Sequence, residues 1–492
     1  MIRKLLFILL FPLTMWGQVQ IGQDILGDVL FDHNGYSVDI SSYGNVIAVG
    51  APENSSNGAK AGQVRVFEII EGDWIQIGQD ILGLAAGDKC GFDVKLSRFG
   101  DILAVGSPFS AINGTNSGNV RVFEYKGGVW VQKGNTIEGK HVSEQSGFSI
   151  SFSLDGNIIA IGAPYKDWNN NFQNPAGTAR VFQYNHNSQT WVQIGQDING
   201  QGFQYYSGSA VELSGDGRIL AIGTPHEGVG GVVRVYENIS GSWIQKGSSL
   251  YAMASADRFG RSLSLSADGS VLAVGAYVNS SVAYSAGHVR VFKYLSNNWQ
   301  QIGSDIFGAS FEESFGFGLS LSEDGKFLGV GGFRASLSRT EGGVFKVYAN
   351  QGGVWTKLFS DINGMDKYEY LGYSVAVSGD GTRGVVGAPQ FKFHIDHYGP
   401  GIVRVYDWSL LSNKSFENKV DFAIYPNPAT NILNIRLDND LSLEQITIFN
   451  NLGQKILTTN EVVINVENLA SGLYFVEVKT NQGKATKKVI IK

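Results

Sequence analysis

Apolar and polar residues alternate at period two in short segments that turn residues separate. Residues 147–153 show this most plainly, because their apolar side chains alternate with serines. Further apolar segments follow at residues 158–161, 179–182 and 191–194. Period-two alternation over four to eight residues predicts half-buried β-strands. The pattern therefore predicts a unit of four strands.

This unit recurs along most of the chain. Its fixed point is a glycine after a short apolar run, and successive copies of that glycine lie 52 to 61 residues apart. The copies are Gly50, Gly106, Gly162, Gly223, Gly275, Gly331 and Gly387. Such sheets carry apolar residues on both faces, and radial repetition lets neighbouring sheets cover them. We expect an all-β chain with a seven-bladed β-propeller.

The count of fourth strands predicts how the ring closes. A tryptophan opens this strand in only six units, at Trp74, Trp130, Trp191, Trp243, Trp299 and Trp355. The seventh unit ends without one, but residues 18–22 repeat the pattern of residues 74–78. We predict that this N-terminal strand completes the last blade, since closure removes open sheet edges.

Four regions follow from these patterns. Residues 1–17 read as a signal peptide, with Arg3 and Lys4 before an apolar run that is too short to span a bilayer. Residues 18–408 hold the propeller, residues 409–420 form a polar linker, and residues 421–492 form a small β-sandwich of the immunoglobulin-like kind. No other segment has the length and apolarity of a transmembrane span.

The string Gly-Tyr/Phe-Ser, then Ser-x-Asp-Gly, then Leu-Ala-Val-Gly-Ala-Pro occurs, with small variations, at residues 35–52 and 147–164. It resembles the FG-GAP repeat, the family that forms the seven-bladed propeller of integrin α subunits and of many bacterial surface proteins. WD40 repeats share the Ser-x-Asp-Gly turn, but their Gly-His and Trp-Asp signatures do not recur here. Both resemblances imply the same architecture.

FG-GAP propellers often bind calcium in the loop between the first and second strands. Calcium needs six to eight oxygens, several of them from carboxylates, whereas each loop here offers one acid. These acids are Asp155, Asp216, Asp268, Asp324 and Asp380. In the first two units Tyr43 and Phe99 take the place of the acid. We therefore expect a hairpin turn with a glycine at positive φ, and no cofactor; calcium remains the disfavoured alternative.

The third strands carry a repeated basic residue, which opens two interpretations. The arginines are Arg65, Arg121, Arg180, Arg234, Arg290 and Arg404. A ring of arginines facing the channel would suit an anionic ligand. The interpretation that we favour is that each stem packs on the aromatic residue two positions later, between blades.

Other chemistry is sparse. His394, Asp396 and His397 cluster in one loop, but no second source of metal ligands is evident, and we predict no metal site. No nucleophile-elbow or metalloprotease motif occurs, so we predict no catalytic residues. Acid pairs for glycoside cleavage need no sequence proximity and stay open. Cys90 is the only cysteine and is expected to be a buried filler.

Charged residues make up 17% of the chain, and its net charge is −6. A nucleic-acid partner would need a basic footprint that this composition lacks.

The loops that vary between units lie on one face of the predicted ring, namely those between the second and third strands and those between units. We place ligand binding there, because variable loops on a uniform scaffold carry function. The candidate residues are Trp168, Phe172, Tyr205, Tyr206, Tyr368, Tyr370, His394 and Tyr398. Aromatic and amide side chains together suit glycan or protein recognition. The alternative is that these rings only pack their own loops.

The C-terminal region carries short alternating strands and four distinctive segments. They are a Tyr-Pro-Asn-Pro opening with Pro426, Asn427 and Pro428, an Asn-Leu-Gly-Gln centre with Gly453, a Gly-Leu-Tyr segment at Gly472, and a basic end. Together they resemble the type A sorting domain of the type IX secretion system of Bacteroidota. The resemblance implies export across the outer membrane by that machinery, removal of the domain near the linker, and release or attachment to the cell surface.

We therefore expect a secreted or cell-surface, non-catalytic binding or adhesion propeller. The first alternative is a secreted propeller enzyme that acts on polysaccharide, and the second is a structural surface protein. An enzyme would concentrate acids at one end of the channel, whereas a binding protein would spread aromatic and amide groups over the loop face.

Overall fold

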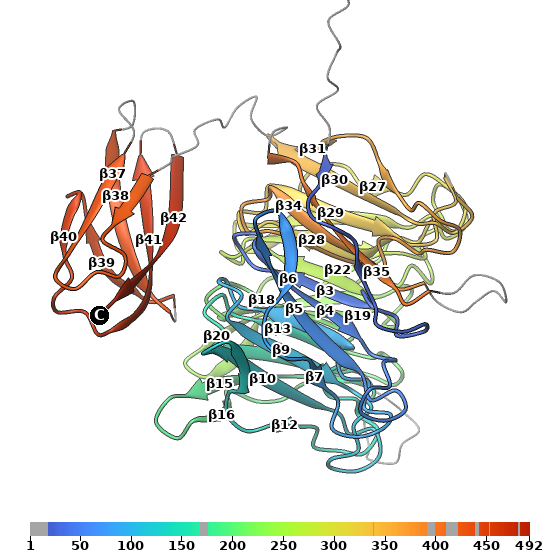
Figure 1. Cartoon of the computed structure of the whole chain (residues 1–492). Helices are drawn as coiled ribbons and strands as arrows, with labels where there is room; N and C mark the ends of the chain where they lie inside the picture. The colour runs from blue at the N-terminus through green and yellow to red at the C-terminus, as the bar shows by residue number, and fades with distance from the viewer. Residues whose placement is uncertain are drawn as a thin grey trace, which may run out of the picture.

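Each of the seven repeats forms one antiparallel sheet, and the sheets surround a central channel (Figure 1). The computed structural model describes residues 18–167, 176–337, 339–390, 399–409, 422–437, 442–451, 453–480 and 483–492. In six sheets four strands lie side by side in chain order, and in the seventh a strand from the start of the described chain takes the fourth place. In every sheet of the ring a short fifth segment pairs with the third strand.

The first strands line the channel and contact the first strands of both neighbouring sheets. They are β3 (Ser37–Ile40), β8 (Asp93–Leu96), β13 (Ser149–Phe152), β18 (Ala210–Leu213), β23 (Ser262–Leu265), β28 (Phe315–Leu321) and β33 (Ser374–Val377). The second strands are the most deeply buried. They are β4 (Val46–Ala51), β9 (Ile102–Ser107), β14 (Ile158–Ala163), β19 (Ile219–Thr224), β24 (Val271–Ala276), β29 (Phe327–Gly332) and β34 (Arg383–Ala388).

The third strands carry the repeated basic residue. They are β5 (Gln63–Ile70), β10 (Asn119–Lys126), β15 (Thr178–Asn185), β20 (Val232–Ile239), β25 (His288–Leu295), β30 (Val344–Gln351) and β35 (Ile402–Asp407). The fourth strands of six sheets are β6 (Asp73–Gln76), β11 (Val129–Gln132), β16 (Thr190–Gln193), β21 (Ser242–Gln245), β26 (Asn298–Gln301) and β31 (Val354–Lys357).

The short fifth segments are a feature that the repeat pattern did not predict. They are β7 (Ile81–Leu82), β12 (Ile137–Glu138), β17 (Ile198–Asn199), β22 (Leu250–Tyr251), β27 (Ile306–Phe307) and β32 (Ile362–Asn363). In the first five sheets a glycine at positive φ, such as Gly78 with φ 72°, separates this segment from the fourth strand; in the sixth sheet residues 358–361 contain no glycine. A side chain at Gly78 would also collide with the ring of Trp130, 2.6 Å away. The outer edge of each sheet therefore consists of the fourth strand, a short interruption and the fifth segment.

Residues near the start of the described chain complete the seventh sheet. The strands β1 (Val19–Gln20) and β2 (Ile25–Leu26) both pair antiparallel with β35. Asp24 also lies 3.1 Å from the guanidinium of Arg404 on that strand. This is the closure that the count of tryptophans predicts. It leaves no sheet of the ring with an unpaired third strand.

Five of the six recurring tryptophans join their sheet to the one before it. The indole Nε1 of Trp74 donates a hydrogen bond of 2.9 Å to the carbonyl of Ile21, and Trp130, Trp191, Trp243 and Trp299 repeat this contact. The amide of Gln23 also accepts from the backbone N–H of Trp74 and donates to its carbonyl. These recurrent residues hold the ring together, as the sequence indicates.

Apolar side chains fill the spaces between sheets. One core cluster combines Val46 and Val64 from the first sheet with Val94 and Leu103 from the second. Cys90 is fully buried beside this cluster, and burial raises the pKa of its thiol above the ordinary value. It fills space as a small apolar residue does.

The C-terminal domain is a sandwich of two sheets around one apolar core (Figure 1). One sheet contains β36 (Phe422–Tyr425), β37 (Ile432–Leu437) and β40 (Val463–Asn465). The other contains β39 (Lys455–Thr459), β38 (Leu443–Asn450), β41 (Gly472–Thr480) and β42 (Gly483–Ile491), in that order. The all-β class and the two-part architecture are as predicted. The predicted signal peptide, residues 1–17, lies outside the described residues, and within those residues no helix has the length and apolarity to cross a membrane.

Candidate functional site

A collar of aromatic rings surrounds one end of the channel. One collar residue comes from each sheet, directly after the glycine that starts the first strand. The seven residues are Tyr36, Phe92, Phe148, Ser209, Arg261, Phe317 and Tyr373. The loops between sheets end here, so the collar lies on the variable-loop face. Five of the seven positions hold aromatic rings, which gives the channel an apolar mouth.

The five rings form one continuous arc. Neighbouring ring centroids lie 4.8 to 5.1 Å apart from Phe317 through Tyr373, Tyr36 and Phe92 to Phe148. These distances are typical of favourable aromatic pairs. Tyr36 and Tyr373 are also joined by a hydrogen bond between their side chains, and burial raises the pKa of both hydroxyls. Both phenols are therefore neutral at physiological pH.

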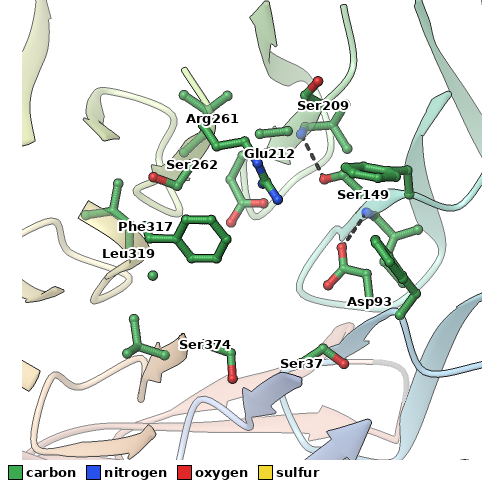
Figure 2. Close-up of a pocket in the computed structure, with 18 of the residues that line it drawn as sticks. Ser37, Asp93, Ser149, Ser209, Glu212, Arg261, Ser262, Phe317, Leu319 and Ser374 are labelled. Atoms are coloured by element: carbon green, nitrogen blue, oxygen red, sulfur yellow. Dashed lines mark hydrogen bonds between the residues drawn. The ribbon is translucent and has the colours of Figure 1, made fainter. Parts of the chain in front are cut away.

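Arg261 fills the gap in the arc. Its guanidinium carbon lies 5.0 Å from the ring centroid of Phe317 and 5.8 Å from that of Phe148. Figure 2 shows this side chain directed into the space that the lining residues enclose. Among the described residues, no carboxylate forms an ion pair with it. The mouth of the channel thus holds a cation between two aromatic faces, with hydrogen-bond donors left for a ligand.

Residues of all seven sheets line the cavity below the collar, which has a volume of about 170 Å³. A second cavity of about 130 Å³ continues toward the opposite end of the channel. Lys95 and Glu212 line both cavities, and Lys95 Nζ lies 3.6 Å from Glu212 Oε1. This ion pair separates the two cavities. A ligand that enters from the loop face therefore meets a space with room for one small group.

Three carboxylates share this single lysine. Burial raises the pKa of Asp93 to about 7, and it also raises the pKa values of Asp39 and Glu212, while the Lys95 ammonium opposes each shift. Burial alone would lower the pKa of Lys95, but the surrounding carboxylates raise it. The lysine therefore stays charged, and its single positive charge must offset the negative charges of all three acids.

Two of these carboxylates also hold the inner edges of neighbouring sheets. Asp39 Oδ2 accepts a bond of 2.7 Å from the backbone N–H of Leu96, and Asp93 Oδ2 accepts one of 2.7 Å from Ile150 (Figure 2). Serine hydroxyls do the same in other sheets. These pairs are Ser149 with Val211, Ser151 with Leu213, Ser264 with Leu321 and Ser320 with Val377. Asp39 and Asp93 thus hold neighbouring sheets together, a structural role that uncharged serines have in other sheets.

The structure connects Tyr206, a predicted loop residue, to the collar. The ring centroid of Tyr206 lies 5.2 Å from that of Tyr165, and Tyr165 lies 6.2 Å from Phe148 of the collar. Tyr206 also packs on His226, at 4.7 Å between centroids. The imidazole of His226 has a pKa lowered to about 4 by burial and by Arg258. The row of rings therefore runs from the mouth outward along the loops of the third and fourth sheets.

Tyr370 also reaches the collar through one ring, but it is buried. It is only 1% exposed, and its hydroxyl donates a bond of 2.9 Å to Glu341. Its ring centroid lies 6.2 Å from that of Phe333, which packs on Phe317 and Tyr373 of the collar. Tyr368 is half-buried and lies 6.5 Å from Tyr370. Tyr205 is half-buried. Trp168, Phe172, His394 and Tyr398 lie outside the described residues, as do Asp396 and His397.

Sequence reasoning missed the collar. Its signal was present, because an aromatic residue follows the first glycine of five units. Residues that recur in every unit usually belong to the scaffold, however, so the sequence alone did not distinguish these rings from core residues. Arg261 was the better signal, since it is the one basic residue at this position.

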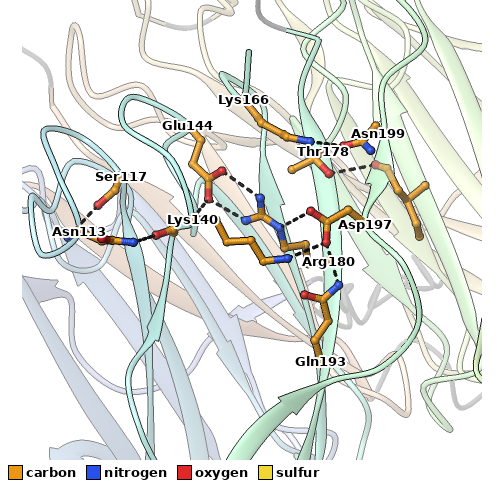
Figure 3. Close-up of polar contacts among 12 residues, drawn as sticks. Asn113, Ser117, Lys140, Glu144, Lys166, Thr178, Arg180, Gln193, Asp197 and Asn199 are labelled. Atoms are coloured by element: carbon orange, nitrogen blue, oxygen red, sulfur yellow. Dashed lines mark hydrogen bonds and ion pairs between the residues drawn. The ribbon is translucent and has the colours of Figure 1, made fainter. Parts of the chain in front are cut away.

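The basic residues of the third strands are structural and pair with acids between the sheets. Arg180 makes two bonds of 2.7 and 2.9 Å to the buried carboxylate of Glu144 (Figure 3). Asp197 also contacts Arg180 and Lys140, and these cations hold its pKa well below its usual range although burial opposes them. Arg234 pairs with Glu227, Lys346 with Glu313 and Arg404 with Glu369.

In the first, second and fifth sheets the arginine also donates to a carbonyl, while Arg65 pairs with Asp28 at 2.8 Å and Arg290 lies 3.8 Å from Asp305. Arg65, Arg121 and Arg290 donate to the carbonyls of Leu26, Leu82 and Tyr251. Each also lies over the aromatic ring two residues later, at 4.9 to 5.5 Å. The predicted aromatic packing therefore holds for these three, but it does not exclude an acid partner, since Arg65 and Arg290 have one as well.

The aspartates of the first hairpin turns serve the turns themselves. Asp155 Oδ1 accepts bonds from the Ser153 hydroxyl and from the backbone N–H of Asn157. The same pair of contacts recurs at Asp216, Asp268, Asp324 and Asp380. The following glycines have φ between 64° and 73°. Across the described residues, no three or more His, Cys, Asp or Glu side chains gather as a metal site would require. Calcium binding remains an untested alternative.

Residues 423–492 match the family model of the secretion system C-terminal sorting domain. The chain carries a type IX sorting domain. The match covers the sandwich and includes the predicted motif residues Pro426, Asn427, Pro428, Gly453 and Gly472. This domain indicates export by the type IX secretion machinery, followed by release or attachment at the surface.

No curated protein matches the chain. Two solved structures resemble its fold, both described as putative 6-phosphogluconolactonases. The protein from Bacteroides uniformis has a TM-score of 0.48 and 14% identity, with 67% of this chain and 85% of that chain covered. The protein from Bacteroides fragilis has a TM-score of 0.47 and 14% identity, with 72% and 97% covered. Similarity at this level gives no argument about activity. Membership of the FG-GAP family stays a prediction.

Proposed function

We propose that the chain is a secreted or surface-attached, non-catalytic binding protein that holds the acidic end of a glycan at the channel mouth. One observation carries the proposal: the Arg261 guanidinium lies between two aromatic faces and, among the described residues, has no carboxylate partner. Guanidinium groups bind carboxylates and sulfates through two parallel N–H donors. The adjacent rings offer stacking surfaces to the apolar face of a sugar.

The size of the cavity supports a chain end as the ligand. A volume of about 170 Å³ closed by the pair of Lys95 and Glu212 leaves no passage for a chain through the ring. The path of rings through Tyr165 and Tyr206 offers further contacts for sugars outside the mouth. We therefore expect one acidic sugar in the collar and neutral sugars along the loops of the third and fourth sheets.

The deciding experiment measures binding of uronic-acid and sulfated oligosaccharides to the purified chain by calorimetry, with neutral oligosaccharides of the same length as a reference. Arg261→Met is expected to weaken binding of the acidic ligands at least about tenfold, because it removes a charge-assisted pair. Arg218→Met is the matched control, since Arg218 is exposed in the short turn between β18 and β19, on the opposite face of the ring from the collar. Equal affinity for acidic and neutral ligands would contradict the proposal, as would unchanged binding by Arg261→Met. Binding that EDTA abolishes would support the calcium alternative.

A polysaccharide-cleaving enzyme is the second candidate, and one observation favours it. The pKa of Asp93 near 7 would suit a general acid at neutral pH. The bond from Ile150 and the equivalent bond at Asp39 give a structural reason for this carboxylate instead. Release of reducing sugar by the chain, and its loss in Asp93→Asn, would establish the enzyme.

A further inference from the structure

Tyr43 and Phe99 occupy turn positions where the other five sheets have aspartate. Their rings stack at 5.7 Å with an angle of 17° between planes. In the other turns a serine hydroxyl donates to the aspartate two residues later. In these two turns the serine still has a partner, because Ser41 donates to Asn45 and Ser97 donates to Asp101. The acceptor therefore lies two residues further along the chain. The two turns do not need their aromatic rings to form.

Phe475 of the sorting domain completes this stack. Its ring lies 3.9 Å from that of Phe99 with only 7° between the planes. On β41, Tyr474, Val476 and Val478 point into the core of the domain, so Phe475 points to the outer face. It is nevertheless only 4% exposed, whereas Leu473 on the same face is 36% exposed. The propeller is what buries Phe475.

Two further contacts join the same surfaces. Lys488 is the Cα partner of Phe475 across β41 and β42, and its Nζ lies 3.4 Å from Glu68 Oε1 on the first sheet. Gly453, in the turn after β38, also faces Phe99, because a Cβ at this position would lie 3.5 Å from the ring. Three separate segments of the sorting domain therefore contact two adjacent sheets of the propeller.

We propose that Tyr43 and Phe99 form a docking site for the chain's own sorting domain, which rests on the short-turn face of the first two sheets until the linker is cut. A contact built around one stacked pair and one ion pair is far smaller than the roughly 1,000 Å² of a stable interface between separate proteins. A short tether raises the effective concentration to the millimolar range, so a weak contact suffices while the chain is intact. Cleavage removes this advantage. The domain then leaves and exposes both rings.

The test uses a zero-length carbodiimide cross-linker on the full chain, because this reagent joins an amine and a carboxylate only when they touch. Mass spectrometry should find a Lys488–Glu68 cross-link in the unchanged chain. Phe99→Ala and Phe475→Ala should each reduce its yield about tenfold, since each removes one ring of the stack. Leu473→Ala is the matched control on the same face and should keep the yield. Thermal unfolding of each variant checks that both domains remain folded.

Absence of the Lys488–Glu68 cross-link from the unchanged chain would overturn the proposal. An unchanged yield in both phenylalanine variants would also overturn it, since the ion pair would then form without docking. The tether argument has its own test, in which a protease site is inserted in the linker and the cut chain is passed over a sizing column. The two parts should separate at micromolar concentration. Coelution would show an interface that does not depend on the tether and would contradict this part of the proposal.

Discussion

Lys95 Nζ lies 3.6 Å from Glu212 Oε1, and this pair spans the channel between the second and fourth sheets. The same ammonium compensates Asp39 and Asp93, which approach from the first and second sheets. One cation thus serves three carboxylates in a narrow, largely closed space. The balance of charge at this point affects both the stability of the ring and the depth to which a ligand can enter.

Lys95→Met should destabilise the protein at pH 8 by about 3 kcal/mol, because it leaves three carboxylates without a cation. The loss should shrink at pH 5, since Asp93, whose pKa burial raises to about 7, takes up a proton there. Denaturant unfolding at both pH values measures the effect. Lys95→Met combined with Glu212→Gln should recover part of the loss at pH 8. An equal loss at both pH values would contradict the electrostatic explanation.

Asp93→Asn should stabilise the protein above pH 7 by about 2 kcal/mol. The pKa of Asp93 is raised to about 7 in the folded state, so the folded protein holds this proton more strongly than the unfolded chain does. The stability that protonated Asp93 contributes is complete below about pH 4 and is lost as the pH rises through 7. Asparagine keeps an oxygen for the N–H of Ile150 but removes the charge.

The difference between the Asp93→Asn variant and the unchanged protein isolates this one group, although other groups also titrate. Melting temperatures measured from pH 4 to 9 should therefore coincide at the acid end and diverge above pH 6. A constant offset at every pH would mean that packing, not charge, separates the two proteins.

The propeller was predictable because alternation and repetition are written in the local sequence. Ring closure followed from a count of one residue type, and β1 pairs with β35 as that count requires. The acid partners of the arginines were not predictable, because even the buried glutamates that pair with Arg180 and Arg234 lie 36 and seven residues away, in loops of different length. The length of each acidic side chain also decides which partner it binds. Glu144 reaches Arg180, whereas the shorter Asp88 binds the backbone of its own loop.

Glu144→Gln should cost about 3 kcal/mol, because Arg180 and Glu144 are both buried and the neutral amide leaves the guanidinium undercompensated. Asp361→Asn is the control, since its pair with Lys357 is partly solvent-exposed, with side chains 44% and 23% exposed, and should change stability by less than about 1 kcal/mol. Urea unfolding of the two variants and the unchanged chain gives the comparison. Similar losses in both would show that burial does not set the strength of these pairs.

Ile25 and Leu26 test ring closure with two adjacent residues of the same strand. Both pair with β35 through their backbones, but Ile25 is 4% exposed and packs into the core between the seventh and first sheets, whereas Leu26 is 51% exposed. Ile25→Ala should therefore lower the free energy of unfolding by about 3 kcal/mol, through lost apolar contact and the cavity left behind. Leu26→Ala should lower it by less than about 0.5 kcal/mol. Amide exchange on β35 should accelerate in the first variant only, because the strand that covers its edge is then held less firmly. Equal effects of the two substitutions would mean that β2 contributes only backbone pairing and that its side chains do not lock the ring.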